Sequence, residues 1–374
     1  MRIAVLSTNR ADASILTPLV LELVENRAFQ LDLVVLGAGS ESRAKTFELA
    51  GIPSENIRLI AFDPQHLEID RSFLNEVSLR VCDYLSVRAL DGIVILGDRV
   101  EMVYAALSCY QHSVPIYHLH GGEQTIGSKD DKYRDVITIL ADIHFVASDV
   151  FASRLENIGV STDAIHVSGS LAVDLMSSIP LISSERLKHE FGLSPDSAHS
   201  ILVCLHPETD LDLRSVESFF SALESLHSTS IVITAPNGDE GSLMILDRIK
   251  SFRPAPSSSF VYFENLGIEK FYSVLAAFDC FVGNSSAIVI ESPYFGCPSL
   301  LVGRRQKGRP VAKNIEVIES FEQDEILATI ESILINKKPR YGSFTLDHEC
   351  FYGRGNASAE IVKVLYGLTG SVVG

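Results

Sequence analysis

Positive charge is scarce in this sequence. Its 374 residues include 31 lysines and arginines against 48 acidic residues, which gives a formal net charge of −17. Nucleic acids and anionic membranes attract basic surfaces, so neither is expected as the main partner of this chain. A small anionic ligand remains compatible with this charge, because a few arginines and helix N-termini are enough to bind a diphosphate.

Long apolar runs and paired cysteines are also missing. No stretch reaches the roughly 20 apolar residues that a membrane-spanning helix needs, and the N-terminal segment lacks the apolar core of a signal peptide. The six cysteines form no C-x-x-C pair, and such scattered thiols are typical of a reducing compartment. We therefore predict a cytoplasmic location.

Apolar residues make up 46% of the chain, and 374 residues are too many for one ordinary core, so we expect two domains. Short apolar runs alternate with amphipathic stretches, which indicates an α/β fold with parallel sheets and helices on both faces. Helices are expected at Ser14–Glu25, Phe73–Arg88 and Val100–Tyr110. Strands are expected at Ile3–Leu6, Leu31–Leu36, Gly92–Leu96, Val114–Leu119, Ile143–Ala147, Ile201–Leu205, Ile231–Ala235, Phe260–Phe263, Cys280–Gly283 and Ser299–Val302.

The strand pattern is weak over Val173–Leu193, and we place a linker there. The division that follows has a Rossmann-like domain at residues 1–172, a second Rossmann-like domain at 173–355 and a C-terminal segment at 356–374. This last segment should form a helix, for which packing back on the first domain is one option.

Polar residues directly after strands are the first candidates for function, because ligands of open α/β sheets bind beyond the C-terminal strand ends. Arg10 follows the first strand, in a loop before a helix that includes Ser14, and its guanidinium can contact phosphate there. The alternative is a solvated arginine, with Asp12 capping the helix. Asp98 and Arg99 follow a later strand, and for Asp98 alone a helix cap is favoured over a catalytic carboxylate.

The densest run of candidate residues begins at the end of the strand that contains His118. Period-two alternation should put His118 and His120 on one face of the strand end. Gly121 and Gly122 permit tight turns and close approach of a ligand, and Glu123 follows at once.

Further charged residues follow at the start of a predicted helix, namely Asp130, Asp131 and Arg134. Together with the preceding motif they are more typical of a catalytic site than of a scaffold. Two alternatives stay open: His-x-His with a nearby glutamate can bind zinc, and acidic residues at a helix start can simply interact with the helix dipole.

The second half has its own strand-end candidates. His206 follows the strand Ile201–Leu205, although a lone histidine is more often structural. Ser285 and Ser286 stand at a helix start, where hydroxyls and backbone N–H groups form an anion site, or where a serine is an ordinary N-cap. Glu291 follows at a spacing that lets its carboxylate accept hydrogen bonds from a ribose diol.

Two shorter motifs complete the second half. Asn237 follows a proline after another strand, and the basic island Gly303–Arg309 contains Arg305 and Gln306. The island is either a diphosphate-binding loop or a solvated turn, and its closeness in sequence to the serines favours the loop.

The ordered set of motifs resembles the hydrolysing UDP-N-acetylglucosamine 2-epimerases of sialic-acid and related nonulosonic-acid synthesis, over residues 1–320. The motifs are Arg10-Ala11-Asp12, Gly97-Asp98-Arg99, His118-x-His120-Gly-Gly-Glu123, Asp130-Asp131-x-x-Arg134, His206-Pro207, Pro236-Asn237, Gly283-Asn-Ser-Ser286 and Arg305-Gln306-x-Gly-Arg309. The resemblance implies a GT-B-like fold of two Rossmann-like domains, a UDP-sugar bound in the cleft between them, and a homodimer.

The resemblance also implies a reaction. A base removes the C2 proton of the sugar while UDP leaves from C1, which gives a 2-acetamidoglucal. Water then adds to C1, and a proton returns to C2 from the other face. The products are UDP and free N-acetylmannosamine or an analogue, and this chemistry needs no nicotinamide, no other cofactor and no metal.

Roles follow by position in the motifs. The candidate acid and base groups are Asp98, Glu123, Asp130 and Asp131, and His206 would protonate or stabilise the departing diphosphate. Phosphate ligands would be Arg10, Ser285, Ser286 and Arg305, with Glu291 on the ribose. The remaining substrate-binding candidates are Ser14, Arg99, His120, Arg134, Asn237 and Gln306.

The chain departs from the family pattern in three places. Thr8 and Asn9 replace Gly-Thr before Arg10, the run Leu36–Gly39 lacks a histidine that many members have, and His120 stands where some members carry glutamate. The duty of base therefore falls on Glu123 or is shared with His120. The differences bear mainly on the sugar, and a UDP-2,4-diacetamido-trideoxyhexose is an alternative to UDP-N-acetylglucosamine.

Three other functions compete with this hypothesis: a non-hydrolysing epimerase that keeps UDP on its product, a GT-B glycosyltransferase, and a non-catalytic module that binds a UDP-sugar. The His-Gly-Gly-Glu and Asp-Asp-x-x-Arg patterns lean against the first. A glycosyltransferase would need an acceptor, and the fold alone does not exclude it.

Overall fold

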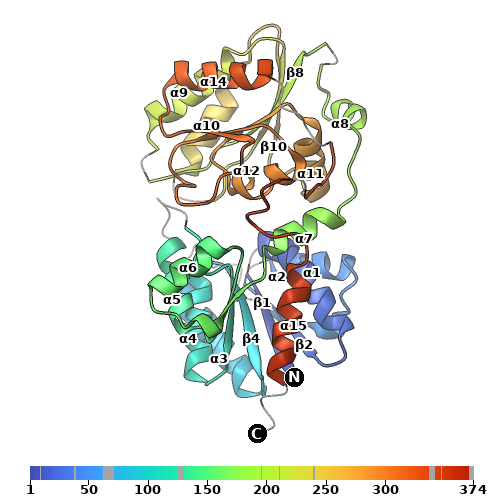
Figure 1. Ribbon diagram of the computed structural model, residues 1–374, viewed down its shortest axis with the longest axis vertical. Coiled ribbons are helices and arrows are strands. Elements are labelled where there is room, and N and C mark those ends of the chain that lie inside the picture. The colour runs from blue at the N-terminus through green and yellow to red at the C-terminus, as the bar shows by residue number, and fades with distance from the viewer. Residues whose placement is uncertain are drawn as a thin grey trace. The chain divides into compact units, whose positions relative to one another are not determined.

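The computed structural model describes residues 1–8, 10–37, 39–61, 71–124, 130–194, 196–209, 211–238, 241–336, 342–346 and 348–369. The chain divides into two compact units (Figure 1). Unit 1 contains Met1–Glu123, Lys129–Leu175 and Tyr352–Gly374, and unit 2 contains Gln124–Ser128 and Met176–Phe351.

Unit 1 is built on a parallel seven-stranded sheet with the order β3-β2-β1-β4-β5-β6-β7. Its strands are β1 (Arg2–Ser7), β2 (Gln30–Leu36), β3 (Ile57–Ile60), β4 (Gly92–Leu96), β5 (Ile116–Leu119), β6 (Ile143–Val146) and β7 (Ile165–Val167). Its helices are α1 (Arg10–Glu25), α2 (Ser40–Leu49), η1 (Ser54–Asn56), α3 (Arg71–Ser86), α4 (Val100–Gln111), α5 (Asp130–Leu140), α6 (Asp149–Asn157), η2 (Thr162–Ala164) and α15 (Ala357–Thr369), while α7 (Leu171–Ser178) crosses the unit boundary.

Strand β1 shows why the sheet is apolar on both faces. Ile3 and Val5 join a core cluster that includes residues of α1 and α15, whereas Ala4 and Leu6 join a second cluster with residues of α3 and α4. Successive side chains of a strand point to opposite faces, so a strand covered on both sides reads as a continuous apolar run.

Helix α15 belongs to unit 1 although it comes last in the chain. It lies beside α1 (Figure 1), and its first backbone N–H groups, of Ala357 and Ser358, donate to the carboxylate of Asp174 at 2.9 and 2.7 Å. Asp174 therefore caps the helix from a distant part of the sequence. The chain changes units after Leu175 and again before Tyr352.

Unit 2 repeats the plan with a parallel six-stranded sheet of order β10-β9-β8-β11-β12-β13. Its strands are β8 (His199–Cys204), β9 (Thr229–Thr234), β10 (Ser259–Phe263), β11 (Cys280–Gly283), β12 (Ser299–Val302) and β13 (Ile315–Ile318). Its helices are α8 (Ser184–Glu190), α9 (Leu213–Glu224), α10 (Ser242–Ser251), α11 (Ile268–Ala277), α12 (Ser286–Ile290), α13 (Ser292–Phe295) and α14 (Gln323–Asn336). One core cluster joins the sheet to α9, α10 and α14.

All the expected strands are present, and three further strands, β3, β7 and β13, are not foreseen by the apolar pattern. Each of the three lies at an edge of its sheet and carries partly buried or exposed residues. Edge strands lose the continuous apolar run that reveals a buried strand. None of the helices in the described ranges has both the length and the apolarity of a membrane-spanning segment.

Candidate active site

The first group of functional side chains lies after β1, β4 and β5, which are neighbours in the sheet of unit 1. Arg134 of α5 connects the acidic residues of this group. Its guanidinium donates to the carbonyl of Glu123 at 2.5 Å, to Asp131 at 2.7 Å and to Asp98. Three residues that the sequence singled out separately therefore meet at one arginine.

Arg134 is only 2% exposed. Burial acts to lower the pKa of its guanidinium, but the carboxylates of Asp98, Glu123 and Asp131 outweigh this effect and raise the pKa. The buried cation is compensated by its anionic partners, as an ion in a low-dielectric environment must be.

Asp98 does not cap a helix. The N-cap position of α4 is occupied by Arg99, and the Asp98 carboxylate pairs instead with Arg134. The cap interpretation, which the motif favours when taken alone, is therefore wrong, because a long-range ion pair takes up the side chain.

His120 leaves the strand and turns toward Glu123. Strand β5 ends at Leu119, and His120 has a φ of 63°, in the left-handed region. Its Nδ1 lies 2.9 Å from Oε1 of Glu123, a residue only 3% exposed. Its Nε2 is buried and has no hydrogen-bond partner among the residues that the structure describes.

His118 has a different environment. It is fully buried, with Nε2 2.9 Å from the carbonyl oxygen of Gly97 and Nδ1 3.2 Å from the hydroxyl of Thr138. Burial lowers its pKa to about 3, so it stays neutral. The expected alternation does not extend to His120, because the strand ends one residue earlier. His118 supports the loop after β4 through these contacts. Both of its ring nitrogens are engaged in them, whereas the alternative zinc site would need one nitrogen to bind the metal.

The two glycines between the histidines and Glu123 are required by space. A Cβ on Gly121 would lie 3.1 Å from Nδ1 of His118. Gly122 has a φ of 79°, and a Cβ there would lie 2.6 Å from the carbonyl oxygen of Phe151. Any larger residue at Gly122 would push the Glu123 segment away from Arg134.

The segment after β1 differs from the expectation in one respect. Arg10 is the first residue of α1 and not part of a preceding loop, and its side chain lies outside what the structure describes. Asp12 is the third residue of the helix and not its N-cap, and its carboxylate accepts hydrogen bonds from the backbone N–H and the hydroxyl of Thr8 at 3.2 and 3.1 Å, so it stabilises the helix start from within the first turn. Ser14 is partly buried on the same helix.

A buried carboxylate that the sequence analysis missed holds Arg99. Glu101 is 4% exposed and accepts a 2.6 Å hydrogen bond from Nε of Arg99. Burial acts to lower the pKa of Arg99, but Glu101, with Asp12 and Asp130 further away, raises it. In the sequence, the only indication of the Arg99–Glu101 pair is that the two residues stand two positions apart at the start of a helix. The negative charge of Asp130 thus contributes to the raised pKa of the Arg99 guanidinium.

In unit 2, the second group of side chains lies after β8, β11 and β12, again neighbouring strands. His206 accepts a hydrogen bond from the backbone N–H of Asn237 on Nδ1 at 2.9 Å, and its Nε2 lies 3.3 Å from the sulfur of Cys204. Burial and the charge of Arg305 lower the pKa of His206 to about 3. The expected role of proton donor to the diphosphate does not fit, because both ring nitrogens are engaged and the ring is neutral.

Asn284 links the three strand ends. Its amide donates to the carbonyl oxygen of His206 at 2.8 Å and accepts from the backbone N–H of His206 at 2.7 Å. The side chain of Gln306 donates to the Asn284 carbonyl at 3.0 Å and is 1% exposed. Gln306, expected as a substrate ligand, thus positions the Asn284 loop from within the unit.

Glu208 is a second carboxylate that the sequence analysis missed. It accepts the backbone N–H groups of Arg304 and Arg305 at 3.3 and 3.0 Å. Burial raises the pKa of Glu208, and these hydrogen bonds offset the rise only in part. Gly303 makes room for it, since a Cβ there would lie 2.6 Å from a carboxylate oxygen of Glu208.

The two serines stand at a very short helix. Ser285 is the N-cap of α12 and accepts a 3.3 Å hydrogen bond from the backbone of Ala287, which matches the ordinary-cap alternative. Ser286 begins the helix and is partly buried. Glu291 follows between α12 and α13, and burial raises its pKa to about 7.

The basic island is partly neutralised. Arg304 and Lys307 both pair with Glu319 at 2.9 Å on the surface. Arg305 is partly buried, and its charge acts on His206 and Glu208. Of the cations in this loop, Arg305 is therefore the one placed among the strand-end groups.

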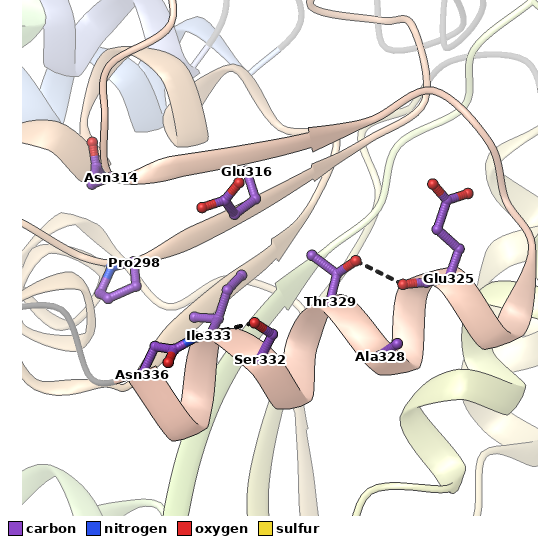
Figure 2. A pocket seen from close by; sticks show the side chains of 9 residues that line it. All are labelled: Pro298, Asn314, Glu316, Glu325, Ala328, Thr329, Ser332, Ile333 and Asn336. Carbon is purple, nitrogen blue, oxygen red and sulfur yellow. Dashed lines mark hydrogen bonds between the residues drawn. The ribbon is translucent and has the colours of Figure 1, made fainter.

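A separate pocket of about 360 Å³ lies elsewhere in unit 2, between the edge of the sheet and α14 (Figure 2). It is lined by Pro298, Asn314, Glu316, Glu325, Ala328, Thr329, Ser332, Ile333 and Asn336. Pro298 and Asn314 precede strands β12 and β13, so this pocket begins at the strand ends opposite to those that carry the candidate residues.

Two units that each wind helices around a parallel sheet, with polar groups at the C-terminal strand ends, define a GT-B-like α/β protein. A solved structure of the UDP-GlcNAc 2-epimerase from Neisseria meningitidis, bound to UDP-GlcNAc, superposes with a TM-score of 0.79 at 16% identity, covering 98% of this chain and 100% of that chain.

The chain belongs to the UDP-N-acetylglucosamine 2-epimerase family, whose sequence model matches residues 22–366. It is 27% identical to the GDP/UDP-N,N'-diacetylbacillosamine 2-epimerase (hydrolyzing) of Campylobacter jejuni, over 88% of each chain. It is 30% identical to a UDP-N-acetylglucosamine 2-epimerase of Neisseria meningitidis serogroup B, over 88% of this chain and 86% of that protein.

Proposed function

We propose that the protein is a hydrolysing UDP-sugar 2-epimerase, which converts UDP-N-acetylglucosamine or a UDP-2,4-diacetamido-trideoxyhexose into UDP and the free 2-epimeric sugar. The observation that carries the proposal is the group of Asp98, Glu123 and Asp131 around the buried Arg134. Such a group supplies the acid and base that proton removal and return at C2 require. The Campylobacter relative is named as a hydrolysing enzyme, which also supports the hydrolysing mode.

The reaction proceeds through a 2-acetamidoglucal. A base of unit 1 takes the C2 proton, the electrons of the C–H bond form a C1–C2 double bond, and UDP leaves with the C1–O electron pair. Water then adds its oxygen to C1 and releases one of its protons to the solvent, while a second group returns a proton to C2 on the opposite face. Asp98, Asp130 and Asp131 are the candidates for this second group.

Unit 2 is proposed to bind the nucleotide. Ser285 and Ser286 present hydroxyls and backbone N–H groups, Arg305 supplies a cation and Glu291 a carboxylate for the ribose diol. Arg10 would add a cation from unit 1. His206 and Gln306 are proposed to position the loop that contains Asn284 and the two serines. Ser14, Arg99 and Asn237 remain proposed substrate contacts.

The direct test is incubation with a panel of UDP-N-acetyl sugars in deuterium oxide, followed by NMR of the products. We expect released UDP and a free manno-configured sugar that carries deuterium at C2. A product that keeps UDP would instead identify a non-hydrolysing epimerase, and donor turnover only with an added acceptor would identify a glycosyltransferase.

The sugar is tested by competition. Relatives named for UDP-N-acetylglucosamine and for diacetylbacillosamine nucleotides leave both substrates as candidates. Because the Campylobacter relative is named for the diacetylbacillosamine nucleotide, we favour the 2,4-diacetamido sugar. We expect its kcat/KM to exceed that of UDP-N-acetylglucosamine at least tenfold, a difference of about 1.4 kcal/mol in transition-state binding.

We also propose a homodimer. The neighbouring helices α3, α4 and α5 expose several large apolar side chains, namely Leu79, Leu107, Tyr110, Val136 and Ile139. Exposed apolar patches of this kind mark interaction surfaces. Sedimentation of the wild type should show a dimer, and Ile139→Glu, at a residue that is 76% exposed, should yield monomers without unfolding the protein.

A further inference from the structure

His120 holds a backbone conformation that histidine seldom adopts. Its φ of 63° lies in the left-handed region, where a Cβ is disfavoured and where glycine would be more stable. The side chain is 16% exposed, and the backbone N–H donates to the carbonyl of Phe145 at 2.9 Å. An unfavourable conformation that is held in place by its surroundings, at a cluster of ionisable groups, is typical of a functional residue.

The bond to Glu123 determines which ring nitrogen of His120 carries the proton. Nδ1 lies 2.9 Å from Oε1 of Glu123. An ionised carboxylate only accepts hydrogen bonds, so the proton stays on Nδ1 and the lone pair is on Nε2. That Nε2 has no hydrogen-bond partner among the described residues, so its lone pair is not already engaged there, and a buried polar atom without a partner calls for an explanation such as a bound ligand.

The nearby carboxylates are engaged in other bonds. Asp98 and Asp131 pair with Arg134, and an oxygen of Glu123 is bonded to His120. A carboxylate oxygen that already accepts a hydrogen bond from a guanidinium has that lone pair occupied, so it is less accessible to a proton of the substrate. His118, the other histidine of the motif, has both ring nitrogens bonded to Gly97 and Thr138.

We infer that Nε2 of His120, oriented by Glu123, is the base that removes the C2 proton of the UDP-sugar. This inference rests on the proposed function and assigns its first step. The C2–H bond breaks, its proton moves to Nε2, and its electron pair forms the C1–C2 double bond as the C1–O pair leaves with UDP. The imidazolium that forms is stabilised by the Glu123 carboxylate. Glu123 is then a positioning residue for His120.

His120→Gly is the decisive variant, because glycine suits the backbone of this position and leaves space for a small base. We expect it to fold, to bind UDP with the wild-type Kd, and to lose kcat by on the order of 10²–10⁴-fold. Added imidazole should restore turnover in a concentration-dependent way. Substrate deuterated at C2 should show a primary isotope effect on the rescued reaction, as expected when the added base takes that proton.

Two further variants serve as controls. Ser113→Gly makes the same change at an exposed residue with a φ of 56° and should leave kcat unaltered. Glu123→Gln keeps an oxygen acceptor but not the charge, so it should lower kcat with little change in KM, and imidazole should not rescue it.

The assignment is overturned if His120→Gly keeps turnover within threefold of the wild type, or if imidazole restores nothing while UDP still binds normally. Failure of the proposed function looks different. In that case the wild type itself releases no UDP from any UDP-sugar in the panel, and the base assignment falls with it.

Discussion

The strand ends of the two units carry contrasting chemistry. In unit 1, the buried Arg134 is paired with the carboxylates of Asp98 and Asp131. In unit 2, the side-chain amide of Asn284 is hydrogen-bonded to the backbone of His206, and burial raises the pKa of the carboxyl groups of Glu208 and Glu291. The contrast teaches that one fold can hold a buried ion-pair cluster at the strand ends of one sheet and a hydrogen-bonded group of desolvated side chains at the other.

Removing the cation of unit 1 should have the largest effect. Arg134→Met leaves the carboxylates of Asp98 and Asp131 without their cation, and breaking a buried ion pair costs about 3–5 kcal/mol. We expect that loss in urea unfolding and no measurable turnover. The matched control is Arg154→Met, at a partly exposed pair with Asp135, where a cost of about 1 kcal/mol or less is expected. Equal losses of stability in the two variants would contradict a special role for the buried ion pairs of Arg134.

Glu291 should make nucleotide binding depend on pH. Because its pKa is about 7, its carboxylate is lost as the pH falls below neutrality, and its hydrogen bonds to a ribose diol weaken. We expect the Kd for UDP to rise roughly tenfold between pH 8 and pH 6, since a hydrogen bond to a charged group contributes about 1.5–3 kcal/mol. Glu291→Gln should bind UDP weakly at both values, and titration calorimetry measures the difference.

The same shift has a stability consequence of defined sign. The folded pKa of Glu291 lies above that of an unfolded glutamate, so the folded state binds the extra proton between about pH 4.5 and 7. The stabilisation is complete at low pH and is lost as the pH rises through 7. Glu291→Gln should therefore gain stability relative to the wild type above pH 7, and a variant with no such gain would show that Glu291 is not desolvated in the folded protein.

His206 should not contribute to the pH profile of catalysis. Its pKa of about 3 keeps the ring neutral from pH 5 to 9. His206→Gln should lower kcat/KM by about fivefold through loss of the hydrogen bond to Asn237, which is worth about 1 kcal/mol. The shape of the pH–kcat curve should stay the same, and the disappearance of one limb would restore a proton-transfer role for His206.

At Gly303 the expected effect is on stability. Gly303→Ala places a Cβ against Glu208 and strains a backbone with a φ of 82°, at a cost of about 1–3 kcal/mol. Gly192→Ala, at a φ of 63° with open space around it, carries the backbone cost alone. The difference between the two melting temperatures measures the crowding of the new Cβ against Glu208 and Phe321, and no difference would argue against a fixed 303–305 loop.

Much of the fold could be predicted because buried parallel strands are apolar on both faces. The runs at Ile3–Leu6 and Gly92–Leu96 are examples. The edge strands β3, β7 and β13 could not, since half-exposed strands lack that run. The motifs around Glu123 and Arg134 were visible in the sequence, whereas the partners Glu101 and Glu208 were not, because an isolated glutamate after a strand or in a helix start resembles a solvated one.

The sequence by itself determined the alternation of strands and helices, the family and the residues at the strand ends, because local periodicity and short motifs depend on neighbouring positions in the chain. Only the tertiary structure decided what these residues do to one another. Asp98 pairs with Arg134 across 36 positions and Glu208 holds a loop 96 positions away. Burial and charge around a side chain come from distant segments, and so a pattern of neighbours could not assign Asp98 to an ion pair or His206 to a neutral hydrogen-bonded ring.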